Sequence, residues 1–261
     1  MVRLPHRRRL LQMLGAAALA TAGGCRPAFD REAGRIAELI EQARTLDPVS
    51  ARIEFISRSF LGTRYVANTL IGGPRRPEQF VVRDDAFDCV TYCETVLAMA
   101  LARDYEEFEA ALKRIRYANS DVRWDERNHY FADWTRRAVE NEICWPVELP
   151  KSVTIDKALN FSNFGRRQMS LLCASAESLL ARPSRLSSGD IIGFLSRRTN
   201  LDFFHTGFVI LSPQGEVTLR HASQSRGRVI DEPMGRFVAA NKVQYAALLR
   251  VVARPVIAGG A

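Results

Sequence analysis

The residues in the sequence best suited to chemistry are a cysteine at the expected start of a helix and a small set of histidines. Cys89 follows Asp88, which suits the N-cap of a helix from Asp88 to Ala102. The unpaired N–H groups and partial positive charge at a helix start should favour a thiolate and lower the thiol pKa from ~8.5. A thiolate attacks an amide carbonyl when an imidazole holds the proton and returns it to the leaving group. This spacing raises the hypothesis that Cys89 is a nucleophile.

The histidines are candidates for that imidazole. Apart from His6 near the N-terminus, the chain has His129, His205 and His221, and the last two fall in predicted strands. Spacing alone does not decide their role, because a strand histidine is more often a hydrogen-bonded core residue. The same holds for cysteine, which commonly packs as a small apolar side chain, and Cys93 lies one turn further along the same helix.

The N-terminus has the pattern of an export signal. Three arginines at positions 7–9 precede a short apolar run at 10–22 and then Gly23-Gly24-Cys25. A charged segment, an apolar segment and a small-residue exit predict a cleaved secretory signal, and the arginine cluster also resembles a twin-arginine motif. The residues before Cys25 resemble a bacterial lipoprotein processing site, where the cysteine is lipidated. We therefore expect an export signal with a lipidation cysteine over residues 1–25 and one domain over residues 26–261.

Composition excludes several classes of protein. The 261 residues carry a net charge of +8, but four arginines of the leader account for half of it, and no long basic block follows. We therefore expect no nucleic-acid partner. The apolar run is shorter than the ~20 residues that span a bilayer, so membrane contact is expected only through a lipid at Cys25. No CxxC or histidine-rich pattern indicates a metal, and no cofactor is expected. Export permits a disulfide between Cys144 and Cys173, but free thiols are an equal alternative.

The order of expected elements places the cysteine and the histidines in different layers. Helical periodicity occupies the first half of the domain, over 27–60, 88–102, 105–115 and 129–141. Short strands separated by turns follow in the second half. Helices first and antiparallel strands second predict an α+β fold. The expected strands are Ile191–Leu195, His205–Leu211, Val217–Ala222, Arg228–Ile230 and Tyr245–Val252.

Six short motifs in this order resemble a known family. They are Phe87-Asp88-Cys89-Val90-Thr91-Tyr92, Ile115-Arg116-Tyr117, His129-Tyr130-Phe131-Ala132-Asp133-Trp134, Gly189-Asp190-Ile191-Ile192, Phe204-His205-Thr206-Gly207-Phe208 and His221-Ala222-Ser223. Together they resemble the N-acetylmuramoyl-L-alanine amidase-like branch of the papain-like NlpC cell-wall cysteine amidases, over about Phe55 to Val252.

The resemblance implies a fold and roles for individual residues. It implies a papain-like α+β fold in which N-terminal helices present the cysteine and pack on an antiparallel sheet. Cys89 would be the nucleophile, His205 the general base and acid, and His221 the residue that orients His205. The backbone N–H of Cys89 would supply part of an oxyanion hole. Residues implied to line or support the substrate cleft are Tyr65, Asp88, His129, Tyr130 and Ser223.

The function implied is that of an exported, monomeric thiol hydrolase acting on peptidoglycan or muropeptides, in the periplasm or anchored to the envelope. The expected bond is the N-acetylmuramoyl–L-alanine amide. A γ-D-glutamyl bond within the stem peptide is the alternative for a hydrolase. A catalytically idle lipoprotein that binds wall fragments is a second interpretation, and acyl transfer to or from lipids by the same residues is a third.

Overall fold

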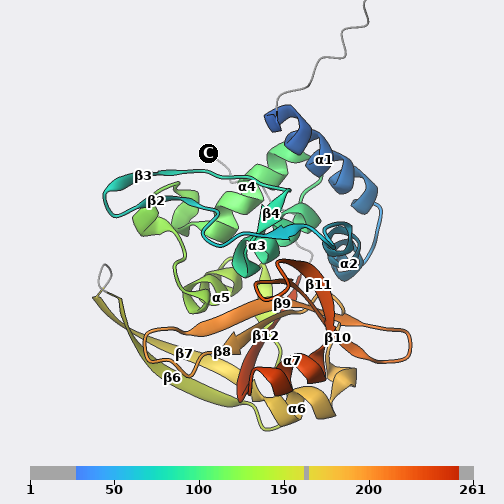
Figure 1. Cartoon of the computed structure of the whole chain (residues 1–261), viewed down its shortest axis with the longest axis vertical. Helices are drawn as coiled ribbons and strands as arrows, with labels where there is room; N and C mark the ends of the chain where they lie inside the picture. The colour runs from blue at the N-terminus through green and yellow to red at the C-terminus, as the bar shows by residue number, and fades with distance from the viewer. Residues whose placement is uncertain (1–27, 162–164, 253–261) are drawn as a thin grey trace, which may run out of the picture.

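A mixed α+β architecture places helices on both faces of a large sheet. The computed structural model describes residues 28–161 and 165–252, and the predicted export signal with Cys25 lies outside them. Helices α1 to α5 form a layer above the sheet, and α6 and α7 lie below it (Figure 1). The α-helices are α1 (Ala28–Ala43), α2 (Val49–Ser59), α3 (Cys89–Leu101), α4 (Tyr105–Arg116), α5 (Phe131–Glu140), α6 (Ala176–Ala181) and α7 (Met234–Ala240).

The helices of the first half follow the predicted pattern. Asp47-Pro48 separates α1 from α2, and α3 begins directly after Asp88, as its N-cap chemistry predicts. The segment expected to be helical from residue 129 becomes helical only at Phe131. Short 3-10 turns complete the helical elements at Ala118–Ser120, Trp124–Glu126 and Pro183–Arg185. No helix in the described part of the chain is long and apolar enough to cross a membrane.

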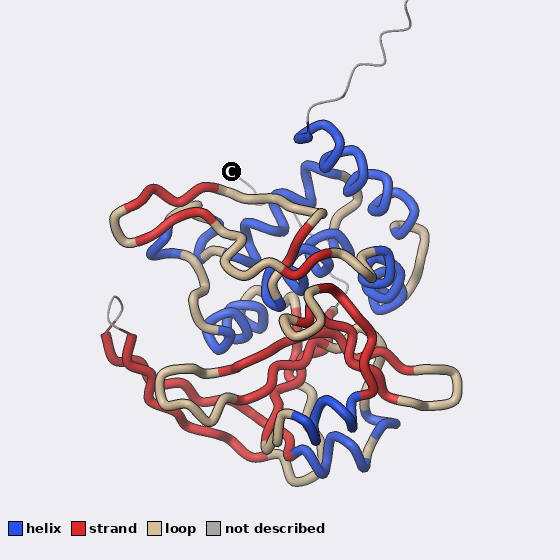
Figure 2. Tube along the Cα trace, viewed as in Figure 1, coloured by secondary structure: helices blue, strands red, loops and turns tan. Residues whose placement is uncertain are grey.

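The main sheet has ten strands within the described residues and is antiparallel except where β1 pairs with β4. Its strands lie together between the upper helices and the two short lower helices (Figure 2). Its order is β4-β1-β11-β10-β9-β8-β12-β7-β6, and β5 also pairs with β12. A separate hairpin consists of β2 and β3. The strands are β1 (Arg64–Tyr65), β2 (Ile71–Gly73), β3 (Arg76–Gln79), β4 (Ala86–Phe87), β5 (Cys144–Pro146), β6 (Val153–Phe161), β7 (Gly165–Ser175), β8 (Ile191–Leu195), β9 (Phe203–Leu211), β10 (Val217–Ser223), β11 (Arg228–Pro233) and β12 (Tyr245–Val251).

The predicted strands all exist, but sequence reasoning missed the long β6–β7 hairpin. These two strands pair in continuous register from Val153↔Cys173 onward and extend the sheet beyond β12. The sequence of β7 begins with a run of charged and polar residues, so its alternation is a weak strand signal. Cys173 on β7 and Cys144 on β5 are both buried free thiols, which decides between the two alternatives left open for this pair.

Two apolar cores lie on opposite faces of the sheet. The larger core joins the helical layer to the upper face, and α3 crosses its centre with residues 91–100 buried. The smaller core lies between the lower face and the short helices, with Leu179 of α6 and Phe237 of α7 against Phe194 and Val209. Because α3 is buried along its length, its N-terminus is held in a fixed position against the sheet.

Buried charges also join the layers. Arg116 at the end of α4 and Glu94 in α3 are both almost completely buried, with 2.7 Å between Arg116 Nε and Glu94 Oε2. Arg220 of β10 forms a bidentate pair with Asp231 of β11 and donates to Ser57 Oγ of α2. Removing one partner of a buried pair leaves an uncompensated charge, so such pairs strongly penalise any separation of the elements that carry them.

We predict that Glu94→Gln lowers the free energy of unfolding by about 3–5 kcal/mol, because Arg116 would remain buried without its counter-charge. The matched control is Glu140→Gln, which removes the exposed i,i+4 pair between Arg136 and Glu140 and should cost at most about 0.5 kcal/mol. Urea denaturation followed by circular dichroism measures both. Equal losses in the two variants would show that the buried pair does not secure α3 to α4.

Candidate active site

Cys89 is fixed in place by the cap of α3. Asp88 has an extended backbone, and its carboxylate accepts hydrogen bonds from the N–H groups of Val90 at 3.1 Å and Thr91 at 2.8 Å. In return, Thr91 Oγ1 accepts a hydrogen bond from the N–H of Asp88 at 3.0 Å. This reciprocal arrangement is a capping box, which stabilises one geometry at the first turn of the helix. The thiol of Cys89 is therefore held where α3 meets the sheet.

Thr206 of β9 provides the contact on the sheet side. The ladder between β9 and β10 ends at Phe208↔Arg220, and beyond that pair Gly207 still lies close to His221. At the next residue, the backbone N–H of Thr206 favours the thiolate of Cys89, as do the N–H groups of Cys89 and Val90. The side chain of Thr206 donates to the carbonyl of Ile192 at 2.8 Å. Cys89 therefore lies beside the residue that directly follows His205.

His205 of β9 and His221 of β10 form a direct pair. His205 Nε2 and His221 Nδ1 are 2.6 Å apart, and the two rings are perpendicular, with Phe237 of α7 packed 5.4 Å from both. Gly207 permits this approach, because a Cβ at that position would lie 2.8 Å from the carbonyl oxygen of Arg220 and 2.9 Å from His221 Cβ. Three consecutive residues of β9 therefore contribute in different ways: His205 pairs with His221, the N–H of Thr206 favours the thiolate of Cys89, and Gly207 leaves room for the strands to approach.

Glu232 of β11 lies at the other ring nitrogen of His221. His221 Nε2 is buried without a hydrogen-bond partner in the structure, and Glu232 Oε2 is 3.5 Å from it. A small rotation of the carboxylate would bring the two atoms within hydrogen-bond distance. His205, His221 and Glu232 therefore form a series of polar groups across three adjacent strands, β9, β10 and β11.

The pKa of Cys89 differs from the lowered value that its place at a helix start predicts, and both histidines are shifted as well. Burial, followed by the carboxylate of Asp88, raises the pKa of the Cys89 thiol to about 12, although backbone N–H groups act in the opposite direction. Burial lowers the pKa of His205 to about 3, with His221 adding to the effect, and burial lowers the pKa of His221 to about 4. The predicted lowering of the thiol pKa is therefore wrong. At neutral pH the resting site holds a neutral thiol and neutral imidazoles.

Two of the residues expected in the cleft lie near these groups. The pKa of Tyr65 is raised to about 12 by burial, with Cys89 and Asp88 contributing, so the phenol lies within electrostatic reach of the thiol. Ser223 lies at the end of β10, and its Oγ is 3.2 Å from that of Ser225. Asp88 has the capping role described above and also disfavours the thiolate.

His129 and Tyr130 occupy a different place. His129 Nε2 is 2.6 Å from the carbonyl oxygen of Trp124, and the two rings are in contact. Both residues line a small polar cavity with Asp133 and Arg167, and neither lines the cavity that contains His205 and His221.

Sequence reasoning missed Thr206 and Glu232. Thr206 could have been found from its place in the histidine motif, whereas Glu232 is brought to His221 only by the pairing of β10 with β11.

The histidine pair opens into a cavity of about 600 Å³, which we call the histidine cavity. The end of β10, the turn to β11 and helix α7 form the rest of its wall. Its lining residues are Phe204, His205, His221, Ser223, Gln224, Ser225, Arg226, Glu232, Arg236, Phe237, Ala240 and Asn241. Within residues 28–161 and 165–252, no group of three histidine, cysteine or acidic side chains is arranged to hold a metal ion.

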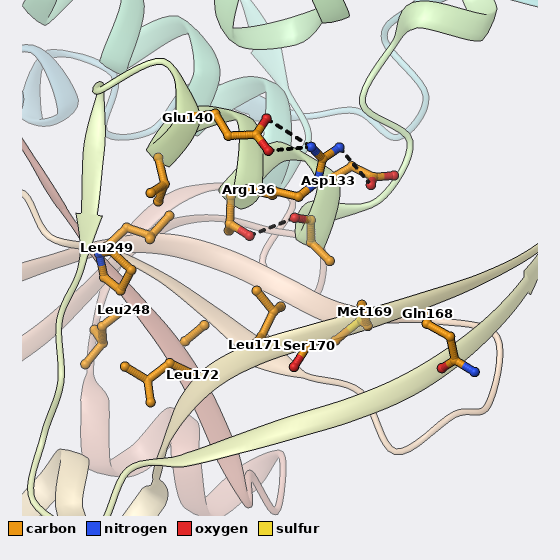
Figure 3. Close-up of a pocket in the computed structure, with 15 residues that line it drawn as sticks. Asp133, Arg136, Glu140, Gln168, Met169, Ser170, Leu171, Leu172, Leu248 and Leu249 are labelled. Atoms are coloured by element: carbon orange, nitrogen blue, oxygen red, sulfur yellow. Dashed lines mark hydrogen bonds and ion pairs between the residues drawn. The ribbon is translucent and has the colours of Figure 1, made fainter.

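A second cavity, of about 400 Å³, lies between α5 and strands β7 and β12 (Figure 3). Leucines from both strands face it, and Arg136 at its edge is paired with Glu140 and Asp133. None of the residues predicted to form the active site lines it. Because its one arginine is already paired and neither cysteine nor histidine lines it, the candidate site for the predicted chemistry remains Cys89 with the histidine pair.

Comparison with known proteins gives the family. The model of the AmiA-like family, described as N-acetylmuramoyl-L-alanine amidase-like, matches residues 55–244. The chain belongs to this family. The match covers α3, β9 and β10, and so includes every element that carries Cys89 and the two histidines. No curated protein matches the sequence.

Solved structures share the fold of this amidase-like chain. A protein of family DUF1460 from Legionella pneumophila superposes with a TM-score of 0.78 and 22% identity, covering 87% of this chain and 97% of its own. An N-acetylmuramoyl-L-alanine amidase from Bacteroides uniformis has a TM-score of 0.64 and 23% identity, covering 76% and 98%. A Bacteroides fragilis protein provisionally named a xylanase has a TM-score of 0.64 and 24% identity, covering 75% and 99%. At these identities, the likeness establishes the fold alone.

The raised pKa of Cys89 predicts how fast the free thiol is alkylated as pH changes. Since only the thiolate reacts, the rate with iodoacetamide should rise about tenfold per pH unit and reach no plateau between pH 6 and 9. Peptide mapping by mass spectrometry separates Cys89 from Cys93, Cys144 and Cys173, which are buried and serve as internal controls. A plateau at acidic pH would mean that the resting protein already holds a thiolate and an imidazolium.

Proposed function

We propose that this amidase-like protein hydrolyses the amide between N-acetylmuramic acid and L-alanine in peptidoglycan or muropeptides, with Cys89 as its nucleophile. The observation that supports this most strongly is the direct pair of His205 and His221, 2.6 Å apart, on the strand whose next N–H, that of Thr206, favours the thiolate of Cys89. The family match supports a wall amide as the substrate.

In the proposed reaction, the sulfur of Cys89 forms a bond to the amide carbonyl carbon while its proton passes to His205 Nδ1. The carbonyl oxygen becomes an oxyanion, for which the N–H of Cys89 is a donor at the helix start. The C–N bond then breaks, and His205 returns the proton to the leaving amine of alanine. Water, deprotonated by the same imidazole, hydrolyses the thioester and releases the free carboxylate of the lactyl group.

This role determines the tautomers of both histidines. If Nδ1 of His205 receives the proton from Cys89, its Nε2 must carry a hydrogen and donate it to Nδ1 of His221. His221 must then carry its own hydrogen on Nε2, where Glu232 is the nearest acceptor at 3.5 Å. His221 accordingly orients His205 and stabilises the imidazolium that forms during attack. Because the resting groups are neutral, His205 acts as a general base at the moment of attack.

The alternatives use the same residues. Cleavage at a γ-D-glutamyl bond of the stem peptide would need only a different position of the substrate, and acyl transfer would need an acceptor other than water. An idle wall-binding protein would have no requirement for a nucleophilic thiol together with an imidazole pair, so the presence of Cys89, His205 and His221 favours catalysis.

We further propose that residues 26–261 act as a monomeric papain-like domain, exported to the periplasm and anchored through a lipid at Cys25.

Mass spectrometry of the digestion products tests the bond that is cut. Purified peptidoglycan incubated with the protein lacking residues 1–25 should yield intact stem peptides that begin with L-alanine, together with glycan strands whose muramic acid carries a free lactyl carboxylate. Stem peptides cut after D-glutamate would instead identify a γ-D-glutamyl endopeptidase.

Variants at the site provide the controls for this digestion. Cys89→Ala and His205→Ala should each lower turnover by more than about 10³-fold, because the two residues act as one unit and their effects do not add. Cys93→Ala is the matched thiol control: it should keep most of the activity while costing about 1 kcal/mol of stability. His221→Ala should keep measurable activity, since it acts through His205. Loss of turnover in Cys93→Ala but not in Cys89→Ala would overturn the choice of nucleophile.

A further inference from the structure

The histidine cavity contains two arginines that form no ion pair. Arg226 lies in the turn between β10 and β11, and Arg236 lies on α7. Neither of these two has an ion-pair partner among the described residues, whereas Arg220 of the neighbouring strand is paired with Asp231. Glu232 is the single acidic side chain among the residues that line the cavity.

The charge of this cavity is therefore positive at neutral pH. Burial holds the pKa of both His205 and His221 far below 7, so neither ring contributes charge. Each of the two guanidinium groups carries one positive charge. Two positive charges against one negative charge give the cavity a net attraction for an anion.

The remaining wall suits an organic ligand. Phe204 and Phe237 are stacked with an interplanar angle of 8° and form an aromatic surface beside the histidines, and the Phe204 side chain is exposed. Ser223, Gln224 and Asn241 add hydrogen-bonding groups. A cavity of about 600 Å³ lies within the size range of small-molecule sites and can hold a group as large as a dipeptide.

The cavity also adjoins a residue that the proposed reaction uses. His205, the proposed base, is part of its wall, with its Nε2 2.6 Å from His221 Nδ1. The N–H of Thr206, the residue that follows His205, favours the thiolate of Cys89. A group bound in the cavity therefore lies beside the imidazole that the proposed reaction requires.

We propose that the histidine cavity is the subsite for a free carboxylate of the substrate's stem peptide, held by Arg226 and Arg236. This inference rests on the proposed function, and it assigns the substrate class as muropeptides whose carboxylates are free rather than amidated. The planar fork of a guanidinium matches a carboxylate in two parallel hydrogen bonds, and two such groups in one cavity favour a single anionic group. Glu232 disfavours a second negative charge in the same space.

Binding measurements with a matched pair of ligands test the subsite separately from catalysis. The probes are a muramoyl dipeptide that ends in D-glutamate with free carboxylates and the same compound with its carboxylates converted to amides. Calorimetric titration uses Cys89→Ala, so that neither ligand is consumed. We expect the acid to bind about tenfold more tightly than the amide, and this preference to disappear in a variant that also carries Arg226→Gln and Arg236→Gln.

Arg182→Gln is the matched control, because Arg182 is an exposed arginine at the end of α6 that does not line the cavity. It should retain the full preference for the acid, and all these surface variants should unfold at the wild-type temperature. Equal affinity for acid and amide, or a preference that survives loss of both arginines, overturns the subsite. Hydrolysis by the wild-type protein is measured in parallel: if neither ligand is cleaved but the acid still binds more tightly, the proposed reaction fails while the subsite stands.

Discussion

The packing of the first turn of α3 against β9 determines where the candidate nucleophile lies. The capping box of Asp88 and Thr91 fixes where the helix begins, and burial of the helix fixes where that beginning lies against the sheet. The N–H of Thr206 on β9 thereby influences the thiol of Cys89. In the proposed mechanism both constraints are required, because the cysteine and the histidines must act on the same substrate atom.

The same burial explains the chemistry of the resting site. A helix N-terminus stabilises a thiolate, but here the partial burial of Cys89 and the carboxylate of Asp88 beside it outweigh the effect of the helix. The imidazoles are kept neutral for the same reason. A neutral pair is less prone to unwanted oxidation or alkylation than an ion pair would be. In the proposed mechanism it becomes reactive when a bound amide aligns the proton transfer from Cys89 to His205.

Sequence reasoning predicted the local features of this arrangement. It failed for the features that depend on contacts between residues distant in the sequence. The N-cap at Asp88, the helix that follows and the strands around His205 and His221 are encoded by neighbouring residues, so they were predictable. The pKa of Cys89 depends on how deeply the packed helix and sheet bury the thiol, which local spacing does not reveal. Arg116 lies in one of the motifs that resemble the family, yet its buried pair with Glu94 makes it structural. The motif signalled an important residue without distinguishing packing from catalysis.

The central claim is that Cys89 forms a thioester with the acyl part of the substrate. Rapid acid quenching of the protein during turnover of a muramoyl peptide, followed by peptide mapping and mass spectrometry, measures this directly. The account predicts an added mass equal to the muramoyl acyl group on the peptide that contains Cys89, and its absence from Cys89→Ala. Turnover at a normal rate with no acyl group on Cys89, or with that group on another residue, would contradict it.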